Sequence, residues 1–395
     1  MQAARVSEPR IAGDVAPGFE PVREAFAHNF GSHGEVGAAV SVVLSGRVVV
    51  DLWGGLADPE TGRAWQQGTL ALVFSTTKGI TAACIAKLEE RGRLDVDAPV
   101  ARYWPEFAAN GKAGITLRDV LSHRAGLAEV EGHFTLEEVC AGDAVCAALA
   151  RQAPQWPPRT QHGYHVRSYG WILGEVVRRV TGRSLGAFLA SEMAAPLGVG
   201  RDLFVGLPAS EDARVARLLP APQPASERER EARARFMGPH TRLGRVLAGP
   251  SGLFEYGEMW NTRLLRGAEM PSSNGIATAR ALARFYAALV GRVDGVRLLA
   301  PETVERFRAP QVDGPDAVIL VPTRFATGFA LPPMLCPTCP SACFGHPGAG
   351  GSLAFADPGA QLGFGYAMNQ MQLGLTSDAR AASLVRAVYA SLRSL

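Results

Sequence analysis

Two β-branched runs near the start of the chain constrain the fold more than any other feature. Residues 37–44 (GAAVSVVL) and 48–54 (VVVDLWG) are separated only by Ser45, Gly46 and Arg47. So short a connection joins antiparallel strands, because parallel strands need a crossover of a dozen or more residues. The pattern therefore predicts an antiparallel hairpin and argues against a doubly wound parallel sheet.

Helical patterns lie at both ends of the chain, and strand patterns occur in both halves. Residues 17–30 carry apolar positions at helical spacing before the hairpin, and residues 377–392 repeat that spacing at the end of the chain. From about residue 99 to 215 helical stretches dominate. Strand patterns then return in three segments, FATGFAL (325–331), GSLAFAD (351–357) and GFGYAMN (363–369).

This order of elements predicts an α/β (α+β) fold. Strands from both ends of the chain share one antiparallel sheet, the terminal helices flank it, and a helical domain is inserted between the two halves. We expect residues 1–98 and 250–395 to form the split α/β domain and residues 99–249 to form the mainly helical one. A chain of 395 residues is long enough for both.

Composition excludes several classes of partner. The 40 basic and 37 acidic residues nearly cancel, which leaves no strong field for nucleic acid or membrane lipid. No apolar run approaches the roughly 20 residues of a membrane span, and the first residues lack the apolar segment of a secretory signal. The six cysteines are too scattered for a disulfide framework. We therefore expect a cytoplasmic protein with reduced thiols.

A Ser-x-x-Lys motif supplies the first candidate catalytic residues. Ser75 and Lys78 (FSTTKG) begin a predicted helix, so that Lys78 lies one turn after Ser75 on the same face. Free N–H groups at a helix start favour negative charge on an attacked carbonyl oxygen. A lysine kept from water can lose its proton and then accept that of the serine hydroxyl. The same residues also suit a helix N-cap serine beside a surface lysine.

The wider sequence resembles the serine β-lactamase-like esterases, also called family VIII carboxylesterases, from about residue 20 to 385. The residues that carry the resemblance are FSTTKG, RGRLDVDAPVARYWPEF and ITLRDVLSHRAGL. The resemblance implies the fold of class C β-lactamases and penicillin-binding proteins. It also implies acyl-enzyme chemistry on esters, sometimes on β-lactams, with no cofactor and no metal.

The second family element is a tyrosine in a Y-x-N arrangement just before a helix, and Tyr164 in PRTQHGY matches it. By resemblance, its phenol passes a proton between the nucleophile and the leaving group. Val166 replaces the asparagine, which removes an amide able to orient substrate or Lys78. That departure weakens the β-lactamase interpretation more than the esterase one. Tyr169, which begins the following helix, is assigned to packing.

The third family element is Lys-Thr-Gly on an edge strand that lines the cleft, and it matches His346, Pro347 and Gly348 as substrate-binding residues. Histidine is mostly neutral at pH 7 and weakens a cationic clamp for a substrate carboxylate, which favours neutral esters. Pro347 cannot continue a central ladder, in agreement with an edge position. The N–H groups of Ala349 and Ser75 are expected to form the oxyanion hole.

Other residues match functional motifs or are candidates for a pocket. Ser184 in GRSLG matches G-x-S-x-G, but it follows a helix instead of a buried strand, so we interpret it as a helix N-cap. His123 in LSHRAGL is interpreted as structural. Trp156 and Trp260 are candidates for lining a pocket.

Three cysteines have the spacing of metal ligands. Cys336, Cys339 and Cys343 lie in a Pro-rich loop, and His346 is the one candidate nearby for a fourth ligand. Because His346 already belongs to the third family element, we interpret the three cysteines as incidental thiols near the cleft.

Together these residues predict a serine carboxylesterase that acts on small, short-chain esters. Ser75 attacks the ester carbonyl, Lys78 accepts its proton and Tyr164 passes a proton to the leaving alcohol. The cleft is expected between the two domains. Two alternatives stay open: β-lactam hydrolysis or acyl transfer by the same three residues, and a catalytically silent binding protein with this fold.

Overall fold

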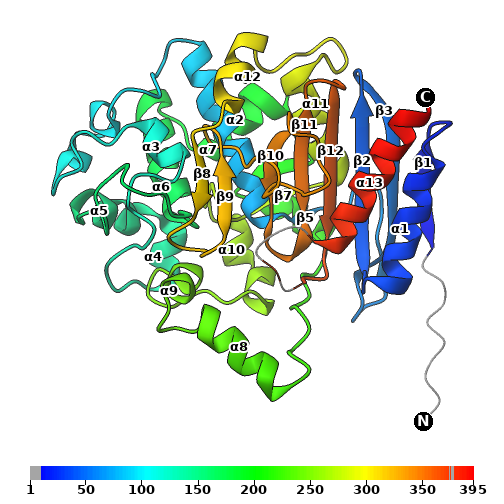
Figure 1. Ribbon diagram of the computed structural model, residues 1–395, viewed down its shortest axis with the longest axis horizontal. Coiled ribbons are helices and arrows are strands. Elements are labelled where there is room, and N and C mark those ends of the chain that lie inside the picture. Colours follow the sequence, from blue (N-terminus) through cyan, green and yellow to red (C-terminus); the bar gives the residue numbers. More distant parts are fainter. Residues whose placement is uncertain (1–9, 373, 375–377) are drawn as a thin grey trace.

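A computed structural model describes residues 10–372, 374 and 378–395, and its centre is an antiparallel sheet (Figure 1). The strand order is β1-β3-β2-β12-β11-β10, and β4 pairs with β3 outside this path. The strands are β1 (Ile11–Val15), β2 (Gly37–Leu44), β3 (Arg47–Asp58), β4 (Arg63–Ala64), β10 (Phe344–Pro347), β11 (Leu353–Asp357) and β12 (Leu362–Met368).

The predicted hairpin is confirmed and forms the middle of this sheet. Strands β2 and β3 are joined at Ser45 and Gly46, whose φ angles of 47° and 80° are those of the tight turns that match strand twist. On its other side β2 pairs with β12, with Val40 opposite Tyr366. Strands from the two ends of the chain therefore share one antiparallel sheet, as the sequence predicts.

Helices cover both faces of the sheet. The terminal helices α1 (Glu20–Ser32) and α13 (Ala379–Ser394) lie side by side on one face (Figure 1). Helix α11 (Ala279–Val290) packs against β2, β11 and β12 on the other face. Helix α2 (Thr77–Glu90) packs beside β10, and it is buried along nearly its whole length. The N-terminal end of α2 is therefore held rigidly.

The remaining elements are further helices and two small sheets. The helices are α3 (Leu117–Leu121), α4 (Leu136–Ala141), α5 (Asp143–Arg151), α6 (Ser168–Thr181), α7 (Leu185–Leu189), α8 (Glu227–Met237), α9 (Arg242–Ala248), α10 (Arg263–Gly267) and α12 (Pro301–Arg308). Helices α6, α7 and α12 pack against α2. The small sheets are β5 (Ala71–Leu72), β7 (Gly275–Ala277) and β6 (Leu203–Val205), and the pair β8 (Val312–Pro315) and β9 (Pro322–Phe325). Helix α8 buries none of its side chains. None of the helices in the described ranges is long and apolar enough to cross a membrane.

One predicted strand is wrong. Residues 325–331 do not form a strand of the main sheet, because the chain turns at Gly328 (φ 87°) and only Ala330 bridges to β10. Strand β10 ends the strand order, so the edge position predicted for Pro347 is confirmed. Several short strands, β1 and β6 among them, were not expected, since runs of five and three residues carry no measurable alternation. The domain division at residues 98/99 and 249/250 stays a prediction.

Candidate active site

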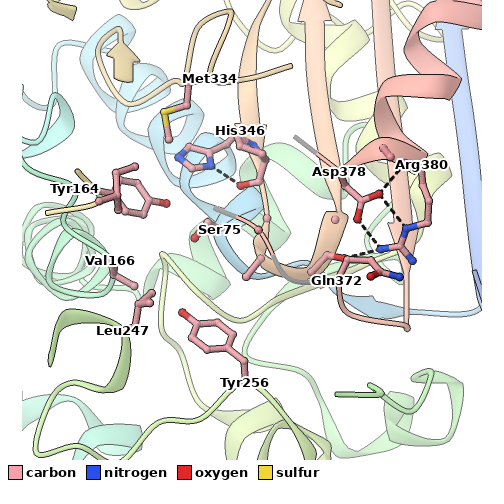
Figure 2. A pocket seen from close by; sticks show the side chains of 18 of the residues that line it. Ser75, Tyr164, Val166, Leu247, Tyr256, Met334, His346, Gln372, Asp378 and Arg380 are labelled. Carbon is pink, nitrogen blue, oxygen red and sulfur yellow. Dashed lines mark hydrogen bonds and ion pairs between the residues drawn. The ribbon is translucent and has the colours of Figure 1, made fainter. Parts of the chain in front are cut away.

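A cavity of about 450 Å³ brings the three predicted motifs together (Figure 2). Ser75, Tyr164 and the segment from His346 to Ala349 line it, and Lys78 lies directly beneath Ser75. Its apolar wall is made by Val166, Leu247, Tyr256, Ile319 and Met334, and its other end by His33, Gln372, Asp378 and Arg380.

Ser75 lies in a single 3-10 turn, η1 (Phe74–Thr76), immediately before α2. The preceding residue, Phe74, has a φ of 42°, a left-handed conformation that is unfavourable for a bulky side chain. The rings of Tyr256 and Trp260 hold it, with centroids 5.3 and 5.1 Å away. Local strain of this kind is typical of functional sites, and here it lies directly beside Ser75.

Main-chain oxygens hold the amine of Lys78 beside Ser75. The Nζ atom lies 3.3 Å from Ser75 Oγ, 2.7 Å from the carbonyl oxygen of Val166 and 3.0 Å from that of Ser272. No carboxylate pairs with Lys78 within the part of the chain that the structure describes. Position 166, where the family has asparagine, therefore still binds Lys78, but through the main-chain carbonyl group of Val166.

The surroundings of Lys78 favour its neutral form. Complete burial lowers the pKa of Lys78 well below its usual value, and the nearby charge of Arg167 lowers it further. Because the two carbonyl groups accept hydrogen bonds from an N–H in either charge state, the neutral amine keeps its position. Its lone pair is then able to accept the proton of the Ser75 hydroxyl.

Tyr164 faces Ser75 from the opposite wall, with its hydroxyl pointing towards the serine (Figure 2). Its ring centroid lies 4.8 Å from Lys78 Nζ, and its backbone N–H donates to Asp316 Oδ1 at 3.1 Å. Burial raises the pKa of Tyr164 above its usual value, against a smaller opposite effect of Ser75. The phenol therefore keeps its proton at neutral pH and is able to donate it.

The segment after β10 approaches Ser75 closely. A Cβ atom at Gly348 would lie 2.1 Å from Ser352 Oγ and 2.2 Å from the carbonyl oxygen of Val73, so only glycine fits there. The backbone N–H groups of Ser75 and Ala349 have no acceptor within the described part of the chain. Two free donors beside the nucleophile match the expected oxyanion hole.

His346 is a neutral group. It is 1% exposed, and its Nδ1–H donates to the carbonyl oxygen of Pro347 at 2.7 Å. Burial, aided by the charge of Lys78, lowers the pKa of His346 to about 3. The position of the family's lysine therefore carries no positive charge at neutral pH.

Two groups that support the site were not identified from the sequence. The buried carboxylate of Asp316 accepts hydrogen bonds from the N–H groups of Tyr164, Val318 and Ile319, although in the sequence it resembles any loop aspartate. The guanidinium of Arg380 donates to the carbonyl oxygen of Gly350 at 2.7 Å and also pairs with buried carboxylates. The contacts of Asp316 with Tyr164 and of Arg380 with Gly350 join positions far apart along the chain, which hid them from the sequence analysis.

The remaining candidates lie outside the catalytic geometry. Ser184 is the N-cap of α7 and its hydroxyl donates to Glu269 at 2.6 Å, as interpreted from its context. His123 is buried, and its Nδ1 accepts the N–H of His165 at 3.1 Å. Trp156 and Trp260 do not line the cavity, so that expectation is wrong; Trp260 packs on Phe74 instead.

Comparisons with known proteins identify the family and the fold. The Beta-lactamase family model matches residues 22–387. Esterase/beta-lactamase LipL of Mycobacterium tuberculosis is 35% identical over 380 residues, 92% of this chain and 83% of that protein. The crystal structure of a family VIII carboxylesterase superposes with a TM-score of 0.87 at 39% identity, and covers 97% of this chain and 100% of its own.

A penicillin-binding protein homologue from Caulobacter crescentus superposes with a TM-score of 0.84 at 38% identity, covering 97% of this chain and 100% of its own. Fold, site and relatives thus define an enzyme of the serine hydrolase class. Within that class the chain belongs to the Beta-lactamase family, in the branch that resembles family VIII carboxylesterases.

Proposed function

We propose that this chain is a serine carboxylesterase that hydrolyses short-chain carboxylic esters through an acyl-enzyme on Ser75. The observation that carries the proposal is the 3.3 Å approach of Lys78 Nζ to Ser75 Oγ. Nothing anionic holds Lys78 in its charged form among the described residues, so the amine is available as a base.

Each step of the reaction uses one group of the site. Ser75 Oγ attacks the ester carbonyl carbon while Lys78 accepts its proton, and the N–H groups of Ser75 and Ala349 stabilise the oxyanion. Tyr164 donates a proton to the leaving alcohol oxygen and regains one from Lys78. Water then attacks the acyl carbon through the same groups, which releases the acid and restores Ser75.

The cavity favours uncharged esters. His346 is neutral, and the guanidinium of Arg380 is already bound by Glu35, Asp378 and main-chain oxygens. Among the described residues that line the cavity, no free cation is therefore in place to bind a substrate carboxylate. The apolar wall and the volume of about 450 Å³ suit a short acyl group together with a small alcohol.

Labelling with a fluorophosphonate tests this proposal, because the reagent phosphonylates activated serines. We expect mass spectrometry to locate the label on Ser75 and a series of aryl esters to be turned over with a preference for short acyl chains. Label on Ser184 would overturn the mechanism. The absence of both label and turnover would favour a catalytically silent binding protein.

β-Lactam hydrolysis by the same residues is a second candidate, supported by the name and 35% identity of Esterase/beta-lactamase LipL. Its natural substrates carry a carboxylate, for which the neutral His346 offers no ionic partner. We expect a chromogenic cephalosporin to be hydrolysed far more slowly than an aryl ester. Comparable kcat/KM values on the two substrates would favour the lactamase function. The carboxylesterase proposal also includes a small-molecule ester as the binding partner and a cytoplasmic location.

A further inference from the structure

The cysteine-containing loop has the geometry of a reversible dithiol. The backbone N–H of Cys339 donates to the carbonyl oxygen of Cys336 at 3.1 Å, which closes a four-residue turn through Pro337 and Thr338. The first and last Cα atoms of such a turn lie within about 7 Å of each other. That separation reaches the range that a disulfide spans, and both thiols are free.

The thiols in this loop influence one another. Thr338 Oγ1 lies 3.0 Å from Cys336 Sγ, and the neighbouring thiols of Cys336 and Cys343 raise the pKa of Cys339 above its usual value. Cys343 Sγ has a further partner in the Tyr389 hydroxyl at 3.2 Å. No group of three or more His, Cys, Asp or Glu in the described ranges is arranged to hold a metal ion. The arrangement of the Cys336–Cys339 pair thus suits chemistry between two sulfurs.

We propose that Cys336 and Cys339 form an oxidative modification site in which a peroxide converts the two thiols into a disulfide. The Cys336 sulfur attacks one peroxide oxygen and the O–O bond breaks, which gives a sulfenic acid and, after protonation, water from hydrogen peroxide. The Cys339 sulfur then attacks the oxidised sulfur, the S–O bond breaks, and a second water leaves as the S–S bond forms.

The neighbouring groups favour the thiolate form of the buried Cys336. The interaction with Cys339, together with hydrogen bonds from the side chain of Thr338 and from the backbone, lowers the pKa of Cys336 below its usual value, against the effect of burial. Burial instead raises the pKa of Cys146 to about 12 and that of Cys84 above its usual range. The same chain therefore contains thiols that serve as an internal comparison.

The loop also connects this modification to the catalytic cavity. Met334, two residues before Cys336, lines the cavity that contains Ser75. Closing the disulfide fixes the turn that follows Met334 and changes the wall against which substrate packs. We expect oxidation to raise KM for an aryl ester by about threefold or more while kcat changes less, since Ser75 and Lys78 are untouched.

Peptide mapping of the peroxide-treated protein tests the site without any need for esterase activity. After treatment with hydrogen peroxide and alkylation, we expect Cys336 and Cys339 to be protected and joined, with loss of two hydrogen atoms, and dithiothreitol to reverse the change. Cys84 and Cys146 should remain free to be alkylated on unfolding. A link through Cys343, or full alkylation of Cys336 and Cys339, would overturn the assignment.

Matched variants separate this chemistry from general damage. Cys336→Ser and Cys339→Ser should each abolish the link, whereas Cys343→Ser keeps a hydroxyl beside Tyr389 and should retain it. Oxidation of Met334 adds one oxygen and is distinguished by mass. A KM effect that persists in Cys336→Ser would overturn the connection to the cavity, because it would come from Met334 instead.

Discussion

At the scale of single residues, the geometry around Lys78 defines the site. The carbonyl groups of Val166 and Ser272 fix the position of the Lys78 amine. Complete burial lowers its pKa and so favours the neutral form. A base is effective when its position and protonation state both suit the reaction. Lys78 meets the two conditions through its surroundings.

Replacing Lys78 by methionine tests its role. Methionine keeps much of the apolar chain but has no amine, so we expect kcat/KM for an aryl ester to fall by about 10²–10⁴ while the fold persists. Lys87→Met on the same helix is the control, since Lys87 pairs with Glu90 at 2.9 Å outside the site. Steady-state kinetics and thermal unfolding of both variants decide the matter; equal activity of the two would exclude Lys78 as the base.

The pH dependence of kcat/KM follows from the shifted pKa values. Only neutral Lys78 accepts a proton, so the rate rises with pH through the lowered pKa of Lys78 and then levels, because burial raises that of Tyr164. Arg167→Gln removes the positive charge that lowers the pKa of Lys78. The rise should therefore move to higher pH in that variant. An unchanged profile would show that Arg167 does not act on Lys78.

At the scale of elements, the proposed oxyanion hole depends on the close approach of β10 to η1. Gly348 permits this approach because it has no Cβ atom. Arg380, at the start of α13, binds the carbonyl oxygen of Gly350 and so fixes the following turn. Strand, turn and terminal helix together hold the N–H of Ala349.

Gly348→Ala tests this arrangement. The added methyl group would lie 2.1 Å from Ser352 Oγ and 2.2 Å from the Val73 carbonyl oxygen, so the strand must move away from Ser75. We expect kcat to fall by about 10²–10³, the loss typical of one oxyanion donor. Gly114→Ala, with no atom within 4 Å of the new methyl group, should keep wild-type activity. Wild-type kcat in Gly348→Ala would contradict the proposed hole.

Much of this element-level structure was predictable from the sequence, and the predictions that failed did so for physical reasons. The hairpin, the helix after Ser75 and the edge position of Pro347 follow from local patterns, namely strand alternation, helical spacing and a missing N–H. Phe74 and Asp316 were missed because their conformation and contacts depend on rings and N–H groups far along the chain. The segment 325–331 was mistaken for a strand because its composition is apolar, although Gly328 turns it.

At the scale of the whole molecule, the sheet joins the two halves of the chain. The pairing of β2 with β12 connects residues more than three hundred positions apart. Ser75, Lys78 and Tyr164 come from the first half, whereas His346 and Ala349 come from the second. The site is therefore complete only when both halves are in place.

Limited trypsin digestion tests this dependence. We expect the first cut within the described fold at an arginine of α8, which buries no side chain, at Arg228, Arg230, Arg233 or Arg235. The two fragments should stay together through the β2–β12 pairing and keep esterase activity. Gel electrophoresis under denaturing conditions, size exclusion and an ester assay on the nicked protein provide the measurement. Activity lost in step with the cut would show that α8 supports the site.

Because main-chain oxygens bind Lys78, substitutions beside it affect substrate selectivity more than they affect the amine. The carbonyl group of Val166 is the same whichever side chain position 166 carries, and that side chain lines the cavity. Mutations at this position can therefore reshape the space around the substrate without disturbing the base. Position 166 is thus a natural first choice for libraries that seek new ester selectivity with the chemistry left intact.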